Sequence, residues 1–334
     1  MSLSYQILGK PFEDNALYVE VRPGEQIHRI LFDCGQRCLD ALRPSTILNI
    51  DQLCFSHFHM DHISGFDSFL RMNYNRERKP VYLWGPQDAL EVLHHRLRGV
   101  TWDLVKDQPG EWQISQITGE GITTHKYFTR EGFAQPHPLE QRPFNGLIAD
   151  QNDYTIEARI MQHRVPSLAY RISEPKQYNI DPEVLQQRNL DPGQWLETVK
   201  DLSREDDEKI EVGERAYSLG QLREWLLVKQ EGESIAYATD LVYEESSIQS
   251  LIEMINGCDT FVCESTYADE DSELAAKHYH LTASQAAQIA AEAGVGKLIL
   301  FHISKRYSQQ GTQKLLEQAR TIFPETYFPE HWTL

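Results

Sequence analysis

The stretch "SHFHMDHISGF" (residues 56–66) places three histidines and one aspartate within six residues, directly after the apolar run "DQLCF". The apolar run predicts a buried strand, and a buried strand end disfavours ionisable side chains unless a ligand compensates for their burial. His57 and His59 are two residues apart, so their side chains point the same way on an extended segment. Asp61 and His62 follow in a turn and can reach a second position nearby. The pattern predicts a metal site on a strand-to-helix loop.

Strand-like and helix-like patterns alternate along most of the chain, which predicts a layered α/β fold. Several predicted strands end in a residue suited to chemistry: Asp33 after "RILF", His163 after "TIEARIMQ", Asp240 after "SIAYAT", Glu264 at the end of "TFVCE" and His302 after "KLILF". Such folds collect functional groups on the loops at one edge of a sheet. We therefore expect these residues to gather near the histidine-rich loop.

Two metal ions need more ligands than this loop offers, because each zinc ion takes three or four protein ligands. One ion could use His57 and His59, and a neighbouring ion could use Asp61 and His62. Later strand ends supply three candidates for the remaining ligands: His163, Asp240 and His302. Asp240 is the natural bridge between the ions, because a carboxylate has two oxygens to share.

The charge of such a site predicts the class of substrate. Two zinc ions outweigh the carboxylates of Asp61 and Asp240 and a bridging hydroxide, and leave a formal charge of about +1. This favours an anion and suits a phosphodiester, which gains negative charge toward its transition state. The chain as a whole carries a net charge of −18 and repels polyanions. Salt screens that repulsion beyond ~8–10 Å, so a local positive site can offset it.

Composition indicates an ordinary globular protein of the cytoplasm. The chain has 334 residues, and we find neither a signal-peptide pattern nor an apolar run long enough to cross a membrane. Its 5 cysteines are an odd number, which favours a reducing compartment. Cys34 and Cys38 have no second pair to complete a zinc ribbon, and we interpret them as small core residues.

Residues 174–233 differ from the rest of the chain. They contain 15 acidic and 8 basic side chains, three prolines and few strong apolar periodicities. This composition predicts an excursion from the main body of the protein. Beyond it the strand and helix alternation resumes.

The motifs, taken in order, resemble the metallo-β-lactamase superfamily, and within it the ribonuclease Z branch of tRNA 3′-end endonucleases. "SHFHMDHISGF" is similar to the superfamily's metal loop, and "LFDCG", "QHRVPSLAYRI" and "YATD" are similar to the motifs around it. The segment "CESTYADEDSELAAKHYHLTASQAAQIAAEAGVGKLILFHISKRY" resembles the long C-terminal block of the branch. The resemblance implies one metallo-β-lactamase-like domain over 1–334, a four-layer αββα sandwich, with an arm-like insertion at about 174–233.

The resemblance also implies roles for individual residues. One zinc ion would be held by His57, His59, His163 and Asp240, and the other by Asp61, His62, Asp240 and His302. His280 matches the histidine that protonates the leaving oxygen, and Glu264 would orient it. Asp61 would also accept a proton, and Asp33 would support the histidine loop. The alternatives for His280 and Glu264 are a helix-entry polar group and an ordinary strand-end carboxylate.

The function implied is a dizinc hydrolase that cleaves phosphodiester bonds of tRNA precursors by attack of metal-bound hydroxide, as a cytoplasmic homodimer without membrane contact. Mn²⁺ and Fe²⁺ are alternative metals. The insertion is acidic where the branch carries a basic tRNA-gripping arm, and phosphate neutralisation supplies much of the affinity for nucleic acids. The alternative is therefore a hydrolase of the same fold that acts on a small phosphodiester, a cyclic nucleotide or a lactone. Residues 115–155 are also longer than is usual in the branch.

Overall fold

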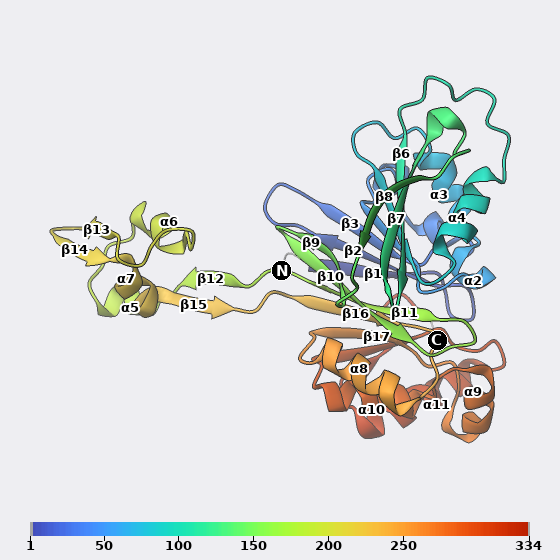
Figure 1. Cartoon of the computed structure of the whole chain (residues 1–334). Helices are drawn as coiled ribbons and strands as arrows, with labels where there is room; N and C mark the ends of the chain where they lie inside the picture. Colours follow the sequence, from blue (N-terminus) through green and yellow to red (C-terminus); the bar gives the residue numbers. More distant parts are fainter. Residues whose placement is uncertain (1–2, 333–334) are drawn as a thin grey trace. The chain divides into compact units, whose positions relative to one another are not determined.

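A computed structural model describes residues 3–332 of the chain, and it divides them into two compact units (Figure 1). The insertion Glu174–Gly232 forms one unit, which we call the arm. The residues before and after the arm form the other, which we call the main unit.

The main unit contains a first sheet of 8 strands in the order β1-β2-β3-β4-β5-β6-β7-β8. Their bounds are Leu3–Leu8, Ala16–Val21, His28–Phe32, Gln52–Cys54, Val81–Gly85, Glu111–Thr118, Gly121–Phe128 and His137–Arg142. Strands β3 to β6 are parallel, and antiparallel strands flank them on both sides. Residues 115–155 contribute the end of β6 and all of β7 and β8 to this sheet.

The second sheet has 7 strands in the order β19-β18-β17-β16-β11-β10-β9. Their bounds, in chain order, are Leu147–Gln151 (β9), Tyr154–Met161 (β10), Ser167–Ser173 (β11), Ser234–Ala238 (β16), Thr260–Glu264 (β17), Lys297–Phe301 (β18) and Thr326–Tyr327 (β19). Strands β16 to β19 are parallel. Strands β10 and β11 form an antiparallel hairpin, with His163 in the connection between them.

Helices cover the outer face of each sheet, and a buried apolar layer joins the sheets. Helices α3 (Phe66–Asn73) and α4 (Ala89–Arg98) flank the first sheet, and α8 (Glu245–Ile255), α10 (Ala283–Ala293) and α11 (Gln309–Ile322) flank the second (Figure 1). The short helix α1 (Pro44–Ile47) packs through Ile47 into the same core cluster as residues of the first sheet. Between the sheets, the ring of Phe32 lies 5.3 Å from that of Tyr170 and 5.9 Å from that of Tyr237. The four-layer αββα sandwich implied by the sequence is confirmed.

The arm has its own small core. It contains two short two-stranded sheets, β12 (Gln177–Ile180) with β15 (Leu227–Gln230) and β13 (Lys209–Val212) with β14 (Arg215–Ser218), and three helices, α5 (Pro182–Gln187), α6 (Trp195–Lys200) and α7 (Leu219–Leu226). Val199, Leu219 and Leu222 are fully buried, so the arm is a packed unit rather than an irregular loop. The Arg188 guanidinium lies 3.7 Å from the ring centre of Trp225.

Candidate metal centre

Strand ends of both sheets supply the residues of one polar cluster. The carboxyl ends of parallel strands meet at one edge of a sheet, so residues that follow such strands are brought together. Asp33 follows β3, the histidine loop follows β4, Asp240 follows β16 by two residues and His302 follows β18 directly. Glu264 is the last residue of β17. The predicted gathering of these residues is what the structure shows.

Three of these residues have left-handed backbone conformations that are rare for residues other than glycine. The φ angles of Asp33, Asp240 and His302 are 62°, 51° and 55°. Such conformations cost about 1–3 kcal/mol each and persist where the surrounding packing fixes them. Each of the three turns the chain sharply at the end of a buried strand, which aims its side chain into the cluster rather than along the strand.

The histidine loop is held in place by close backbone contacts. The Cys34 amide donates to the His62 carbonyl at 2.8 Å, and the Gly65 amide donates to the Cys34 carbonyl at 2.8 Å. A Cβ atom on Gly65 would lie 2.4 Å from the carbonyl oxygen of Gly35, so this position requires glycine. His59 occupies the N-cap position of the short helix α2 (Met60–Ile63), which turns Asp61 and His62 toward a second position, as the sequence predicts.

All seven candidate ligands lie in the cluster. Two groups of four have ligand atoms within 4.8 Å of one another and share one carboxylate: His57, His59, His163 and Asp240, and Asp61, His62, Asp240 and His302. A third such group joins Asp240 and His302 to Glu264 and His280. The first two sets are the same as those the resemblance implies. Asp240 lies 3.1 Å from His57 Nε2 and 3.0 Å from His62 Nε2, at the centre of both.

Four of the histidine rings are held through Nδ1, which leaves Nε2 directed at the cluster. Their partners are Asp33 Oδ2 for His62 at 2.8 Å, the Tyr279 carbonyl for His163 at 2.9 Å, Ser56 Oγ for His57 at 3.1 Å and Thr266 Oγ1 for His302 at 3.1 Å. Metal-binding histidines characteristically donate their other ring N–H to a carboxylate or carbonyl, which fixes the tautomer. The buried Nε2 of His62 lies 3.0 Å from Asp240 Oδ2 and 3.5 Å from Asp61 Oδ2, so it faces the carboxylates of its candidate ligand group, as a ligand atom would.

The charges of the cluster also fit cations. Asp33 and Glu264 are fully buried and Asp240 nearly so, and buried carboxylates are stable only when paired or bound to metal. Burial opposes ionisation of Asp240, but His302 and His62 outweigh it and hold the pKa of Asp240 well below its ordinary value. Burial likewise opposes the charge of Asp61, but hydrogen bonds to His302 and His62 keep the pKa of Asp61 low. These histidine and aspartate donors suit a divalent metal.

His280 and Glu264 form a pair at one side of the cluster. His280 Nδ1 lies 2.9 Å from Glu264 Oε2, and Glu264 also accepts from the Leu241 amide at 2.9 Å and the Thr266 hydroxyl at 2.6 Å. Burial opposes the charged imidazolium, but the Glu264 carboxylate outweighs it and raises the pKa of His280 to about 9. Bound cations nearby would lower this pKa again, because like charges repel.

Some residues that hydrogen-bond to the cluster were not predicted from the sequence. Tyr237 donates to Asp33 Oδ2 at 2.8 Å, and Ser56 donates to the same carboxylate through both its amide and its hydroxyl. Thr266 contacts Glu264 and His302. Ser56 and Thr266 lie next to predicted site residues and could have been found by adjacency. The sequence contains no signal that joins Tyr237 to Asp33, because 204 positions separate them.

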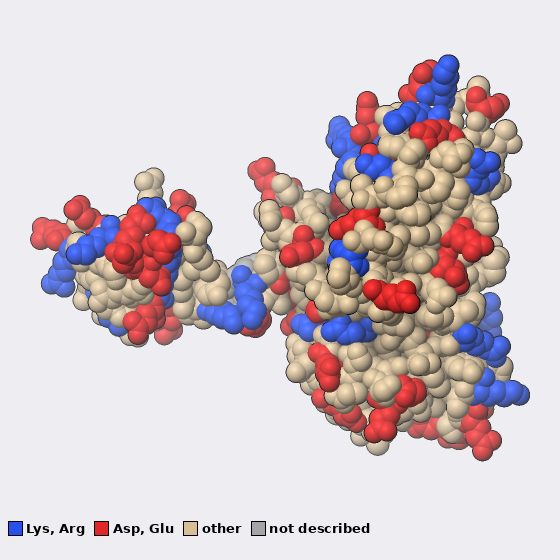
Figure 2. All heavy atoms as spheres, in the orientation of Figure 1, with Lys and Arg blue, Asp and Glu red and all other residues tan. Residues whose placement is uncertain are grey.

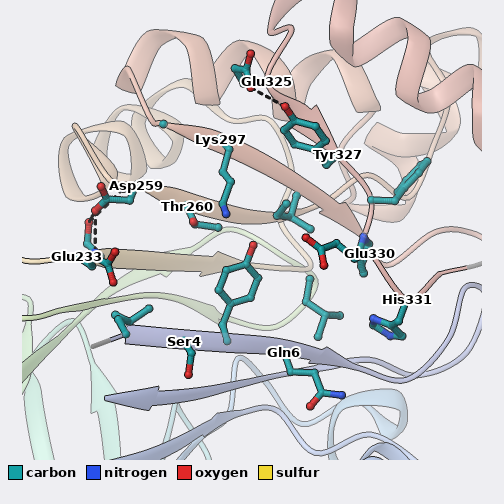
Figure 3. Close-up of a pocket in the computed structure, with 18 residues that line it drawn as sticks. Ser4, Gln6, Glu233, Asp259, Thr260, Lys297, Glu325, Tyr327, Glu330 and His331 are labelled. Carbon is teal, nitrogen blue, oxygen red and sulfur yellow. Dashed lines mark hydrogen bonds between the residues drawn. The ribbon is translucent and has the colours of Figure 1, made fainter. Parts of the chain in front are cut away.

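A separate cleft of about 940 Å³ lies away from the cluster (Figure 3). Lys297 and Tyr327 line it, and its acidic residues include Glu325 and Glu330, while none of the candidate ligands lines it. Lys297 begins β18 whereas His302 follows the end of the same strand, so about five residues of ~3.3 Å rise separate them. The cleft is therefore distinct from the candidate metal centre.

The surface and the cysteines agree with the expectations from composition. Lys and Arg side chains are intermixed with Asp and Glu side chains over the visible faces of both units, without one continuous basic face (Figure 2). All five cysteines are buried and free, so Cys34 and Cys38 are core residues as predicted. Within residues 3–332, every helix is too short or too polar to span a bilayer.

Comparisons with known proteins identify the family. A ribonuclease Z from Deinococcus radiodurans is 36% identical over 330 residues, which cover 99% of this chain and 98% of that protein. The chain belongs to the ribonuclease Z family. A family member from Synechococcus sp. (strain CC9605) is 30% identical over 321 residues and matches 93% of the chain. Family models of the anti-Pycsar protein Apyc1 and of the β-lactamase superfamily domain match residues 7–161 and 223–303. This ribonuclease Z-family chain is therefore a metal-dependent hydrolase.

Solved structures show the same fold. The metallo-β-lactamase-fold protein YhfI from Bacillus subtilis aligns with a TM-score of 0.59 at 14% identity, covering 98% of this chain and 95% of that one. Human short-form tRNase Z aligns with a TM-score of 0.54 at 15% identity, covering 97% and 95% of the two chains. At these identities the likeness concerns the fold alone.

Proposed function

We propose that the chain is a phosphodiesterase that uses two zinc ions and cleaves tRNA precursors at their 3′ side, as a ribonuclease Z does. The observation that carries the proposal is the pair of four-residue ligand groups that share Asp240, beside the His280–Glu264 pair. One ion would be held by His57, His59, His163 and Asp240, and the other by Asp61, His62, Asp240 and His302. Bound there, the ions would supply Lewis acidity at the phosphoryl group and lower the pKa of a water.

The residues of the chain would orient the substrate and move protons. Asp61 is the most exposed of the candidate carboxylates, with 45% of its side chain accessible, so it can accept a proton from an entering nucleophile. The Glu264 carboxylate raises the pKa of His280 and so favours the protonated imidazolium, which can donate its proton to the leaving oxygen. Glu264 holds the imidazole through Nδ1, which leaves Nε2 to face the leaving group.

The second candidate function is hydrolysis of a small phosphodiester, a cyclic nucleotide or a lactone at the same centre. The observation in its favour is the charge of the arm. Residues Glu174–Gly232 contain 14 acidic and 8 basic side chains, a net charge of −6. An arm of this charge is poorly suited to bind the phosphates of a tRNA, whereas a small substrate would need no such contact. Whether the protein is a homodimer stays a prediction.

The deciding experiment is incubation of the purified, zinc-loaded protein with a 3′-extended tRNA precursor and, in parallel, with bis-p-nitrophenyl phosphate. Release of the intact 3′ trailer supports the tRNA function, and hydrolysis of the small ester alone selects the second candidate. His59→Ala and Asp240→Ala should each remove both activities while the circular-dichroism spectrum stays native. Full activity in either variant would refute the site.

A further inference from the structure

Tyr279 has a backbone conformation that is unusual for a tyrosine. It caps the C-terminus of α9 (Ser272–His278) with φ 63° and ψ 46°, in the left-handed region. Glycine is the usual residue at such a cap because a Cβ atom is strained there. The chain follows this rule at the end of α10, where Gly294 has φ 61° and ψ 39°. A bulky aromatic residue at the equivalent cap of α9 therefore needs a reason outside helix termination.

The backbone of Tyr279 supports a candidate ligand, and its side chain takes no part in that contact. The Tyr279 carbonyl accepts a hydrogen bond from His163 Nδ1 at 2.9 Å, and any residue with the same backbone conformation would offer that carbonyl. Within the described part of the chain, the Tyr279 hydroxyl makes no hydrogen bond, and the residue is 39% exposed. Its ring lies 6.2 Å from the ring of His163 in an edge-on arrangement. The aromatic ring thus stands beside a candidate ligand and faces solvent.

Two further exposed apolar residues are close in sequence to candidate ligands. Met60, between His59 and Asp61, is 70% exposed, and Val165, two residues after His163, is 39% exposed. Large apolar side chains are normally exposed singly, whereas these three come from separate segments next to candidate ligands. An exposed aromatic ring beside a candidate ligand suits a substrate with a flat apolar group attached to the phosphate.

We propose that Tyr279 stacks on a nucleobase carried by a nucleotide at the scissile phosphodiester, and that it is a specificity-determining residue of the site. The inference rests on the proposed phosphodiesterase function and names its substrate class as a nucleotide ester. Every base has a π-face, so stacking on an exposed tyrosine selects nucleotides without selecting a base sequence. The strained cap serves this role because the left-handed turn lifts the ring out of the packed end of α9 while the carbonyl still orients His163.

A cycle of enzyme variants and substrates tests the proposal. The variants are Tyr279→Ala and the matched control Tyr279→Phe, and the substrates are a tRNA precursor with its normal bases and one with an abasic ribose beside the scissile phosphate. We expect Tyr279→Ala to lower kcat/KM by about 5- to 150-fold on the normal precursor, the range for loss of one base–aromatic stack. On the abasic precursor the same variant should lose little more, and Tyr279→Phe should keep the wild-type preference. Bound zinc should be equal in all three proteins.

Other outcomes overturn the proposal. An equal loss on both substrates, or lost zinc, would show that Tyr279 acts only through His163. An unchanged kcat/KM would show that the ring does not touch substrate. Tyr279→Gly relieves the backbone strain, so this variant should be at least as heat-stable as the wild type, which separates lost stacking from lost folding.

The stacking proposal can be tested even if the protein does not cleave tRNA precursors. If the wild type cleaves no precursor, the same cycle is run with thymidine 5′-(4-nitrophenyl) phosphate and methyl 4-nitrophenyl phosphate, which share a leaving group and differ in the nucleoside. Titration calorimetry with uridine 5′-monophosphate and ribose 5-phosphate adds a readout that does not depend on turnover. Equal preference for the nucleoside in the wild type and in Tyr279→Ala, in kinetics and in binding, would refute the inference.

Discussion

Replacement of Asp33 by asparagine tests the support behind the candidate ligands. The Asp33 carboxylate is fully buried and accepts four hydrogen bonds: from the Ser56 amide at 2.7 Å, the Ser56 hydroxyl at 2.7 Å, the Tyr237 hydroxyl at 2.8 Å and His62 Nδ1 at 2.8 Å. Asparagine keeps the shape of the side chain but has one accepting oxygen and an NH₂ group that only donates.

Either orientation of the new amide leaves a donor facing a donor. With the NH₂ group toward Ser56 N–H, that amide is left without an acceptor in a buried site, which costs about 1–3 kcal/mol. With the NH₂ group toward His62, the imidazole must accept at Nδ1 and carry its proton on Nε2, the atom directed at the cluster. A protonated Nε2 cannot bind metal. We therefore expect Asp33→Asn to lose about 1–3 kcal/mol of unfolding free energy and about 10- to 100-fold in zinc affinity.

The assay combines urea unfolding of the metal-free protein with competition of zinc against a chelator of known affinity. Asp51→Asn is the matched control, because Asp51 is 7% exposed and accepts from the Arg29 amide at 2.8 Å, in contact with Lys79 rather than with the cluster. The control should lose stability and keep its zinc affinity. If Asp33→Asn behaves like Asp51→Asn and binds zinc as tightly as the wild type, the role assigned to Asp33 is wrong.

Two further predictions concern the acid and the arm. His280→Ala should lower turnover by about 10²- to 10⁴-fold with bound zinc unchanged. Glu264→Gln removes the carboxylate that raises the pKa of His280, so it should move the alkaline limb of the kcat–pH profile to lower pH. Loss of zinc in the first variant, or an unmoved limb in the second, would contradict the assignment. Replacing residues 174–233 by Asn-Gly should preserve hydrolysis of a small phosphodiester, because Ser173 and Ser234 are register partners that a two-residue turn can join. Binding of a tRNA precursor is measured at several salt concentrations, and the slope of log K for binding against log salt concentration should differ between the wild type and this variant by less than about 0.9, the value of one phosphate contact. A larger decrease in the magnitude of the slope would show that the arm binds the phosphate backbone.

Most residues of the candidate centre could be predicted from the sequence, because they lie directly after apolar runs that are typical of buried strands. The histidine loop is a dense string after an apolar strand, and Asp240 and His302 follow runs of buried residues. Parallel strands place their carboxyl ends together whatever the loop lengths, so residues 245 positions apart in the chain (from His57 to His302) could be assigned to one site.

Other features could not be predicted because they depend on tertiary contacts between ordinary residues. Tyr237 looks like one more apolar position of a buried strand, and only the packing of the two sheets brings its hydroxyl to Asp33. The cap conformation of Tyr279 is contrary to residue preference, so no propensity rule finds it. The small core of the arm could not be predicted either, since its short elements have too few apolar repeats to show a period.

The structure also changes the charge balance on which substrate attraction depends. The ligands alone include two carboxylates, Asp61 and Asp240, and with two divalent cations and a hydroxide they leave a formal charge of about +1. Asp33 and Glu264 are also fully buried, against His62 and His280, and change this formal charge to about −1. The two added carboxylates lie behind histidines, at the Nδ1 side, so a substrate at the Nε2 side is nearer to the cations than to them. Coulomb attraction falls with distance and is strongest in the dry interior. Arrangement rather than net charge would therefore attract a phosphodiester, and a protonated His280 would add the remaining positive charge on the side where the leaving oxygen departs.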